Sequence, residues 1–364
     1  MNIDHPTTRF IYSLKEIKAR YHELKQVLTD KTIYYSVKPN PHEEILRFIA
    51  SLGLRAEVSS LGELDAALKA GFEPSLIVYG GPGKTFADIY SAAEQGVRYF
   101  SLESLTELER LARVEELTGN ALNRILRIFS PGKSGRLNMM MPNSKFGITP
   151  DEVRRYISEH DVAVYGIHIY NGTQVDENNF RASIYQTNKL AEEIESIIGY
   201  RLQYVNYGGG LAWPFMQSGM SPISSETVAG VLTDVEACFE FGRYLVASCG
   251  TFETEVLDVK ERDGQQILIV SAGVNILNGL SASGRLMRHQ PGFYVAEGKH
   301  GEALLPTAIY GPLCTPADYF TLDTSLPRLC PGDVLKLPNC GAYAANTGLA
   351  NFLLRKPAEE MIVD

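Results

Sequence analysis

Short apolar runs alternate with longer amphipathic segments through the first two-thirds of the chain. The apolar runs have the length of buried strands, and the segments between them are rich in Ala, Leu, Glu and Lys, as helices are. The predicted strands lie near residues 32–37, 54–58, 76–79, 98–101, 124–129, 163–169, 203–207 and 237–241. Eight strands separated by helices favour a closed (β/α)8 barrel of the TIM type, because doubly wound open sheets usually have fewer strands.

The pattern changes after about residue 250, where strands alternate with turns that contain Gly and Pro. Residues 254–260, 266–271 and 334–337 predict strands, and this part of the chain is therefore mostly β. We expect an α/β protein in which a barrel, residues 10–250, is followed by a β-rich C-terminal domain, residues 251–364. Residues 1–9 are expected to form a short lead-in strand that joins the second domain.

Composition and charge narrow the classes of function. The 364 residues are 45% hydrophobic and 21% charged, as in globular proteins. The net charge of −9 and the lack of a basic run argue against nucleic acid as a partner. No apolar run is long enough for a membrane span and no leader sequence is evident, so we expect no membrane association and a cytoplasmic location. Five cysteines without Cys-x-x-Cys spacing predict reduced thiols, with no metal site.

Functional side chains of such barrels gather at the carboxyl ends of the strands. The first predicted strand ends at Lys38. On the strand alone, the favoured interpretation is that Lys38 reaches solvent, since lysine is rarely buried without a partner. The alternative is that partial desolvation lowers the pKa of its ammonium, which would make Lys38 a candidate for covalent attachment of an aldehyde cofactor.

Three consecutive glycines, Gly208, Gly209 and Gly210, follow the seventh predicted strand. Glycines lose much backbone entropy on folding, so such a run requires a reason. Successive glycine N–H groups can surround a phosphate without interference from side chains. A tight turn is the alternative explanation.

Several strand-end segments together resemble one known family. The pattern Tyr-x-Val-Lys-x-Asn at 35–40 is similar to the cofactor-lysine strand of the fold-type III pyridoxal-phosphate decarboxylases. This group includes the ornithine and diaminopimelate decarboxylases, with alanine racemase as a more distant relative. Further similar segments are Glu-x-x-Ser-x-x-Glu at 57–63, Ser-Lys-Phe-Gly at 144–147, Gly-x-His-x-Tyr-x-Gly-Thr-Gln at 166–174, Glu-Phe-Gly-Arg at 240–243 and Gly-Ala-Tyr at 341–343. The second segment also fits a simple helix cap by Ser60 and Glu63.

The resemblance implies pyridoxal 5'-phosphate as the cofactor and Lys38 as the residue that binds it. Glu240 would keep the pyridine nitrogen protonated, so that the ring withdraws electrons from the substrate's α-carbon. Tyr170 replaces a histidine that stacks on the ring in the family. A tyrosine can stack in the same way but cannot supply the positive charge of an imidazolium. The other implied cofactor-binding residues are Glu57, Thr173, Gly208, Gly209, Gly210, Gly242, Arg243 and Tyr343.

Cys314 lies in a Gly-Pro-x-Cys segment at 311–314 that is similar to one which, in the family, crosses a dimer interface. The resemblance therefore implies a homodimer with shared active sites, in which Cys314 donates a proton after carbon dioxide leaves. The alternative is that this cysteine is a small buried hydrophobic residue, as most cysteines are.

Thr315 marks a departure from the ornithine and diaminopimelate enzymes, where an acidic residue follows the cysteine and binds the distal amine. A hydrogen bond to a charged group is worth roughly 1.5–3 kcal/mol, and a neutral hydroxyl forms no ion pair. We therefore expect a small-molecule or carrier-linked amino acid with an acidic, amidated or conjugated far end, as in siderophore and antibiotic biosynthesis. The candidate substrate residues are Thr315, Asp318, Arg285 and Arg288, although two solvated arginines would explain the last pair equally well.

Two alternative functions stay open at this point. One is decarboxylation of a free diamino acid, as in the diaminopimelate and ornithine enzymes. The other is amino-acid racemisation on the same fold, although alanine racemase has an arginine where Glu240 stands.

Overall fold

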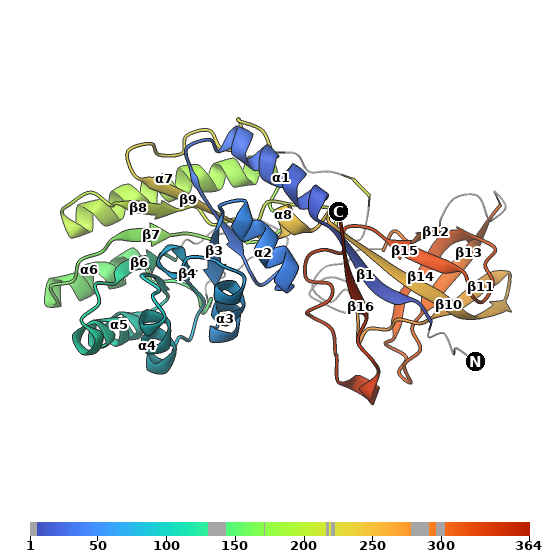
Figure 1. The fold of residues 1–364 in the computed structure, drawn as a ribbon. Coiled ribbons are helices and arrows are strands. Elements are labelled where there is room, and N and C mark those ends of the chain that lie inside the picture. The colour runs from blue at the N-terminus through green and yellow to red at the C-terminus, as the bar shows by residue number, and fades with distance from the viewer. Residues whose placement is uncertain are drawn as a thin grey trace. The chain divides into compact units, whose positions relative to one another are not determined.

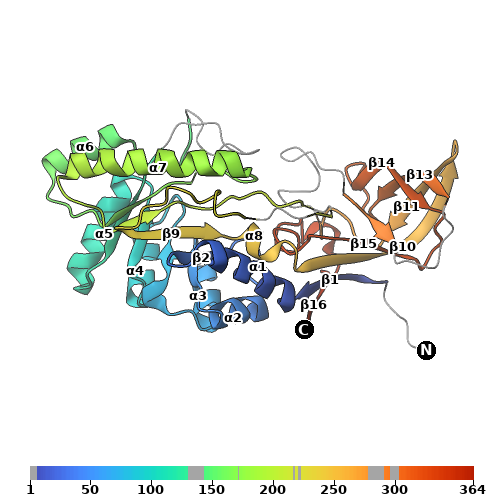
Figure 2. The same cartoon turned by 90° about the horizontal axis from the view of Figure 1, so that it is seen from above.

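The computed structural model describes residues 6–129, 143–170, 172–215, 218–219, 223–277, 291–295 and 303–364. The chain forms two compact units. The barrel unit consists of Tyr21–Ala212 and Pro222–Leu245, and the β-rich unit of Met1–Arg20, Trp213–Ser221 and Val246–Asp364. Figures 1 and 2 show the elements of each unit from two directions.

The barrel unit contains a closed barrel of parallel strands, which confirms the predicted TIM-type fold. Its strands are β2 (Thr32–Ser36), β3 (Arg55–Val58), β4 (Val78–Tyr79), β5 (Tyr99–Leu102), β6 (Asn123–Arg127), β7 (Gly166–His168), β8 (Tyr204–Asn206) and β9 (Glu236–Phe241). The barrel closes where β2 pairs with β9, with Tyr34 opposite Glu240. All eight strands lie at the positions that the apolar runs predict.

Helices lie between most of these strands along the chain, with none between β8 and β9 in the described residues (Figure 1). They are α1 (Leu14–Val27), α2 (Glu43–Ser51), α3 (Leu61–Lys69), α4 (Phe86–Glu94), α5 (Leu105–Thr118), α6 (Pro150–Glu159), α7 (Glu177–Ile198) and α8 (Arg243–Val246), with the 3-10 turn η1 (Pro74–Leu76) before β4. The Ser60 half of the predicted cap is present, because the Ser60 side chain accepts a hydrogen bond from the Glu63 backbone N–H, whereas the Glu63 side chain accepts one from the Ser59 N–H. Ser60 therefore fixes where α3 begins, directly after the segment that carries Glu57.

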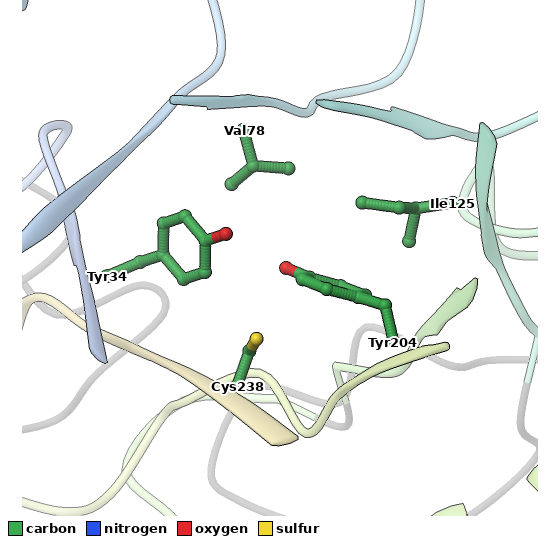
Figure 3. Close-up of a cluster of buried hydrophobic side chains, with 5 residues drawn as sticks. All are labelled: Tyr34, Val78, Ile125, Tyr204 and Cys238. Atoms are coloured by element: carbon green, nitrogen blue, oxygen red, sulfur yellow. The ribbon is translucent and has the colours of Figure 1, made fainter. Parts of the chain in front are cut away.

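The barrel interior is not wholly apolar. Figure 3 shows Tyr34, Val78, Ile125, Tyr204 and Cys238 as one fully buried cluster, with the two tyrosine hydroxyl groups directed toward one another. Interiors of such barrels are usually filled by branched apolar side chains. The two hydroxyl groups therefore need hydrogen-bond partners inside the barrel.

The β-rich unit is built on one mixed sheet in the order β12-β15-β10-β11-β13-β14, with β1 and β16 attached through β10. Its strands are β1 (Thr8–Ser13), β10 (Gly250–Arg262), β11 (Gln265–Val270), β12 (Tyr294–Val295), β13 (Leu304–Tyr310), β14 (Tyr319–Pro327), β15 (Val334–Leu337) and β16 (Glu359–Val363), and the 3-10 turn η2 (Phe352–Leu354) precedes β16. The expected lead-in strand is present, since β1 pairs with β10 in antiparallel fashion.

The division between the units differs slightly from the one predicted at residues 250 and 251. The boundary lies at Leu245 and Val246, and the β-rich unit also takes in Met1–Arg20, beyond the predicted residues 1–9. The pairing of β1 with β10 ties the start of the chain to this unit. Whether the β-rich unit also contributes to a partner's active site stays a prediction.

Candidate active site

Lys38 and Glu57 form an ion pair at the carboxyl ends of β2 and β3. Lys38 Nζ lies 2.7 Å from Glu57 Oε2, and 43% of the Lys38 side chain is exposed, against 5% of the Glu57 side chain. Burial raises the pKa of Glu57, but the charge of Lys38 and hydrogen bonds from Lys38, Ser36 and Ser59 outweigh it, so the net pKa is lowered. An ionised Glu57 thus holds an ammonium that solvent and ligands can still reach.

Glu240 is a buried carboxyl at the end of β9. Its Oε1 accepts a hydrogen bond from Asn206 Nδ2 at 2.8 Å, and its Oε2 lies 3.5 Å from His168 Nε2. Burial and the charge of Glu57 raise the pKa of Glu240 to about 8, against the opposing effect of Lys38. Without a bound partner, the carboxyl therefore keeps its proton at neutral pH, and a nearby cation would favour its ionisation.

Tyr170, which follows β7, lies close to positive charge. Its side chain forms a hydrogen bond with Thr173, and the Arg127 guanidinium lies 5.8 Å from the centre of its ring. Arg127 also pairs with Glu103 at 2.5 Å and lies over Phe146 at 4.6 Å. Burial raises the pKa of Tyr170, so its hydroxyl is neutral. Arg127 thus places a cation beside the Tyr170 ring.

The glycine run after β8 has a packing role. A Cβ atom on Gly209 would lie 1.8 Å from the carbonyl oxygen of Glu240, and one on Gly210 would lie 1.9 Å from the carbonyl oxygen of Gly172. Neither contact is sterically possible, so the backbone around these loops requires glycine. This explains the run without a ligand, and the binding of phosphate there stays a prediction.

Lys84 and Glu107 form a second ion pair, which the sequence analysis did not identify. Lys84 Nζ lies 2.8 Å from Glu107 Oε2, both side chains are 2% exposed, and the ammonium also donates to the carbonyl oxygens of Gly81 and Ser101. Burial lowers the pKa of Lys84 against the opposing charge of Glu107. All these contacts are internal, so this pair stabilises the barrel wall, whereas Lys38 remains accessible.

The loop between β13 and β14 carries three candidate residues. Cys314 is exposed and Thr315 is half-buried. Asp318 is buried, with Oδ1 accepting from the Val274 N–H at 2.7 Å and Oδ2 from the Leu313 N–H at 2.6 Å. Its carboxylate thus holds the loop together, and the predicted contact of Asp318 with substrate stays a prediction.

The other candidates have less definite surroundings. Tyr343 is half-buried and has a φ of 61°, which is uncommon for a residue other than glycine. Gly242 packs against Pro39, and Arg243 is a buried residue that begins α8. Arg285 and Arg288 lie outside the described residues.

The structure therefore brings one group of candidates together. Electrostatic interactions link Lys38, Glu57, Tyr170, Glu240 and Arg243 within the barrel unit. The candidates Cys314, Thr315, Asp318 and Tyr343 belong to the β-rich unit. Sequence reasoning missed Arg127, His168 and Asn206, although each lies within two residues of the end of a predicted strand and could have been singled out by that position. Within the described ranges, no group of three or more His, Cys, Asp or Glu side chains could hold a metal ion, and no helix there is long and apolar enough to cross a membrane.

Comparison with known proteins gives consistent matches. Residues 14–248 match the family model of the pyridoxal-dependent decarboxylase, pyridoxal binding domain. L-glutamyl-[BtrI acyl-carrier protein] decarboxylase from Niallia circulans is 30% identical, over 95% of this chain and 86% of its own length. The 2-[(L-alanin-3-ylcarbamoyl)methyl]-2-hydroxybutanedioate decarboxylase from Staphylococcus aureus is 27% identical, over 96% of this chain and 92% of its own. Diaminopimelate decarboxylases of several bacteria also match over most of the chain.

A solved structure agrees with these matches. Diaminopimelate decarboxylase from Helicobacter pylori, complexed with L-lysine, superposes with a TM-score of 0.85 at 25% sequence identity. The alignment covers 99% of this chain and 92% of the Helicobacter chain.

Proposed function

The chain belongs to the pyridoxal-dependent decarboxylases, and we propose that its substrate is an amino acid whose far end is acidic, amidated or joined to a larger group. Amino-acid decarboxylation with pyridoxal 5'-phosphate is the activity of the family. When bound, the cofactor supplies a ring that withdraws electrons from the substrate's α-carbon. The identity of the far end is the part that we propose.

The barrel residues suit this cofactor. It carries an aldehyde, a basic pyridine nitrogen, a flat ring and a phosphate. The chain offers an accessible amine in Lys38, a buried carboxyl in Glu240 and an aromatic face in Tyr170. His168 Nε2 is buried near Glu240 and has no hydrogen-bond partner among the described residues, so this region has a polar atom available. These features support the assignment of the cofactor site to the carboxyl ends of the barrel strands.

We assign the following roles to these residues. Lys38 binds the cofactor, and Glu57 orients its amine. Glu240 would keep a proton on the pyridine nitrogen, and Tyr170 and Thr173 would contact the ring and its substituents. Gly208, Gly209, Gly210, Gly242, Arg243 and Tyr343 are the proposed contacts of the phosphate and its surroundings. Cys314 is the proposed proton donor, reaching the site of a second copy of the chain in a homodimer.

The observation that carries the substrate proposal is the lack of an exposed carboxylate in the loop from Gly311 to Asp318, all of which the structure describes. Asp318 is the only acidic residue of this loop, and its two oxygens accept backbone hydrogen bonds, one from Leu313 within the loop and one from Val274 outside it. Thr315 follows the cysteine, and its hydroxyl accepts a long hydrogen bond from the Ala317 N–H at 3.4 Å. The loop therefore offers no free charge to a distal ammonium.

Two relatives support the same proposal. The Niallia protein is named for a glutamyl group on an acyl-carrier protein, and the Staphylococcus protein for an alaninyl conjugate of a hydroxybutanedioate. The first name describes an amino acid bound to a carrier protein, and the second an amino acid whose far end is amide-linked and acidic. If Arg285 and Arg288 contribute, they would meet such an anionic group.

Decarboxylation of free diaminopimelate is the second candidate. The overall similarity to diaminopimelate decarboxylases, including the Helicobacter structure, favours it. The two candidates differ in whether the far end of the substrate carries a free ammonium group, so a comparison of turnover between the two substrate classes separates them.

The test is a screen of carbon dioxide release over free diamino acids, amino acids that are acylated or amidated at the far end and keep a free α-amine, and carrier-linked glutamyl groups. We expect at least tenfold higher kcat/KM for a conjugate than for ornithine, lysine or meso-diaminopimelate. Efficient turnover of a free diamino acid, within the usual range of about 10⁴–10⁸ M⁻¹s⁻¹, would contradict the proposal.

A pair of matched variants sharpens this test. Thr315→Asp introduces the acidic residue at the position after the cysteine, and we expect it to raise kcat/KM for free diamino acids by about tenfold or more. Thr315→Ser keeps a neutral hydroxyl and serves as the control. An equal response of the two variants would show that the charge at this position does not select the substrate.

A further inference from the structure

Polar groups in the barrel interior are not accounted for by the function proposed above. Tyr34 on β2 and both Tyr204 and Asn206 on β8 have no exposed surface. Burying a hydroxyl or an amide costs free energy unless it is hydrogen-bonded. Their contacts therefore need an explanation.

The Asn206 amide has one orientation that fits its surroundings. One of its terminal atoms lies 2.9 Å from the backbone N–H of Gly208. A backbone N–H only donates, so this atom is the oxygen Oδ1. The nitrogen Nδ2 therefore faces Glu240 Oε1 at 2.8 Å and the Tyr204 hydroxyl at 3.2 Å. Both N–H bonds of the amide have acceptors.

The hydrogen-bonded chain continues behind Asn206. The Tyr204 hydroxyl forms a hydrogen bond with the Tyr34 hydroxyl, and the two are directed toward one another in Figure 3. The Tyr34 hydroxyl in turn accepts a hydrogen bond from Arg55 Nη1 at 3.3 Å, and Arg55 pairs with Glu236 at 2.7 Å. Since Glu236 begins β9, the chain of contacts starts at the amino end of the barrel strands and ends on Glu240. These hydrogen bonds hold the side chains of both tyrosines in place and, through Tyr204, also the Nδ2 atom of Asn206.

The other neighbours of Glu240 do not form a short hydrogen bond with its carboxyl group as Asn206 does. His168 Nε2 lies 3.5 Å from Glu240 Oε2, beyond good hydrogen-bond length, and His168 Nδ1 is bonded to Ser101 Oγ at 2.9 Å. Burial lowers the pKa of His168 well below its usual value, so the imidazole is neutral. Lys38 and Arg127 act on the Glu240 carboxyl through their charge, in the direction opposite to Glu57.

We propose that Asn206 is a positioning residue for Glu240. Its Nδ2 holds one carboxyl oxygen in place and, because an amide nitrogen donates but does not accept, it favours the ionised carboxylate that a protonated pyridine nitrogen requires. This inference rests on the cofactor and on the role of Glu240 proposed above, and it is independent of the substrate.

The test compares Asn206→Asp and Glu240→Gln with the wild-type holoenzyme. Asn206→Asp keeps an oxygen for the Gly208 N–H but presents a second carboxyl oxygen to Glu240. A residue that only closes the Gly208 turn would tolerate this change. We expect Asn206→Asp to weaken pyridoxal 5'-phosphate affinity by about ten- to a hundredfold. It should also shift the pH at which the visible absorption of the bound cofactor changes, and lower kcat more than it changes KM.

Two further variants separate positioning from general disturbance of the core. Tyr204→Phe removes the acceptor behind Asn206, and we expect changes of the same kind but smaller, about two- to tenfold. Val78→Ala leaves a cavity in the same buried cluster but removes none of the hydrogen bonds that lead to Glu240. It should therefore lower Tm and leave the absorption titration unchanged.

The outcomes are distinguishable. Wild-type affinity and titration in Asn206→Asp, with Glu240→Gln impaired, would overturn the inference and leave the role of Glu240 standing. A Glu240→Gln variant that binds and titrates like the wild type would overturn both. If Val78→Ala shifts the titration as much as Asn206→Asp does, the effect comes from the core as a whole, and the inference is wrong.

Discussion

The Lys38–Glu57 pair of the barrel unit and the loop from Gly311 to Asp318 of the β-rich unit use charged side chains in opposite ways. At the strand ends of the barrel, Lys38 pairs with Glu57 and still exposes 43% of its side chain. In the loop from Gly311 to Asp318, the one carboxylate is 2% exposed and bonded to backbone N–H groups. The barrel thus presents charge where a cofactor would bind, whereas the loop presents an uncharged thiol and hydroxyl. Cofactor binding and substrate selection can therefore be altered separately.

The largest expected effect separates two lysines of the barrel. Lys38→Ala should lower kcat by on the order of 10⁴-fold or more, because no other amine is proposed to bind the cofactor. Lys84→Met should instead lower the free energy of unfolding by roughly 3–5 kcal/mol, because it leaves Glu107 buried without its partner. Steady-state kinetics and urea unfolding of both variants measure the difference. Near-normal turnover of Lys38→Ala would contradict the proposal that Lys38 binds the cofactor while Lys84 stabilises the fold.

The second prediction concerns the thiol in the β-rich unit. Cys314→Ala should lower kcat by about 10²–10⁴-fold, the usual contribution of a general acid. If Cys314 serves a partner's site, mixing the inactive Lys38→Ala and Cys314→Ala chains should restore activity, since one site of each hybrid dimer has both residues. The control is either variant mixed with itself. No recovery under conditions of subunit exchange would show that each site is built from one chain.

Glu240→Gln tests the role of the buried carboxyl group at the end of β9. We expect kcat to fall by about 10²–10³-fold, as when a preorganised electrostatic group is removed. The folded protein without cofactor keeps the Glu240 proton up to a pKa of about 8, while the unfolded chain loses it near 4.5. The stability of the wild type relative to the variant is therefore greatest below the lower value and falls as the pH rises toward the higher one. The free energy of unfolding of Glu240→Gln, taken relative to that of the wild type, should rise by on the order of a few kcal/mol between pH 5 and pH 8. Urea unfolding of both proteins at the two pH values measures this. A constant difference would contradict this.

The smallest expected effect lies in the loop. Asp318→Asn replaces one acceptor by an amide nitrogen, which would face a backbone N–H that also donates. We expect a loss of about 1–3 kcal/mol of stability, with a weaker effect on cofactor affinity. The exposed Asp323 on β14 provides the control, and Asp323→Asn should change neither property. Full stability of Asp318→Asn would show that the loop does not depend on this carboxylate.

Much of the fold could be predicted because the apolar runs of the barrel are short, regular and separated by helices. The strand that ends before Lys38 was placed within a residue or two of β2. The β-rich unit was harder, since β12, β13, β14 and β16 were not identified. The run of β13 contains Pro306, and β16 is mostly exposed, so neither has the clear apolar pattern of a buried strand.

The candidate site could be predicted in part, from the rule that side chains at strand ends converge. Lys38, Glu57 and Glu240 follow that rule. The partners of these residues could not be predicted, because the contact of Asn206 with Glu240 joins two strands that are distant in sequence. The inward direction of Asp318 depends on the positions of Val274 and Leu313, which only the folded chain reveals.

The most direct test of the central claim is to reduce the holoenzyme with borohydride and to map the peptide that carries the trapped cofactor. We expect the cofactor to be attached to Lys38, whose amine is accessible at the end of β2. The buried Lys84 serves as the internal comparison, and Lys145 as a second one. Recovery of the cofactor on Lys84 or Lys145, with Lys38 unmodified, would contradict the account.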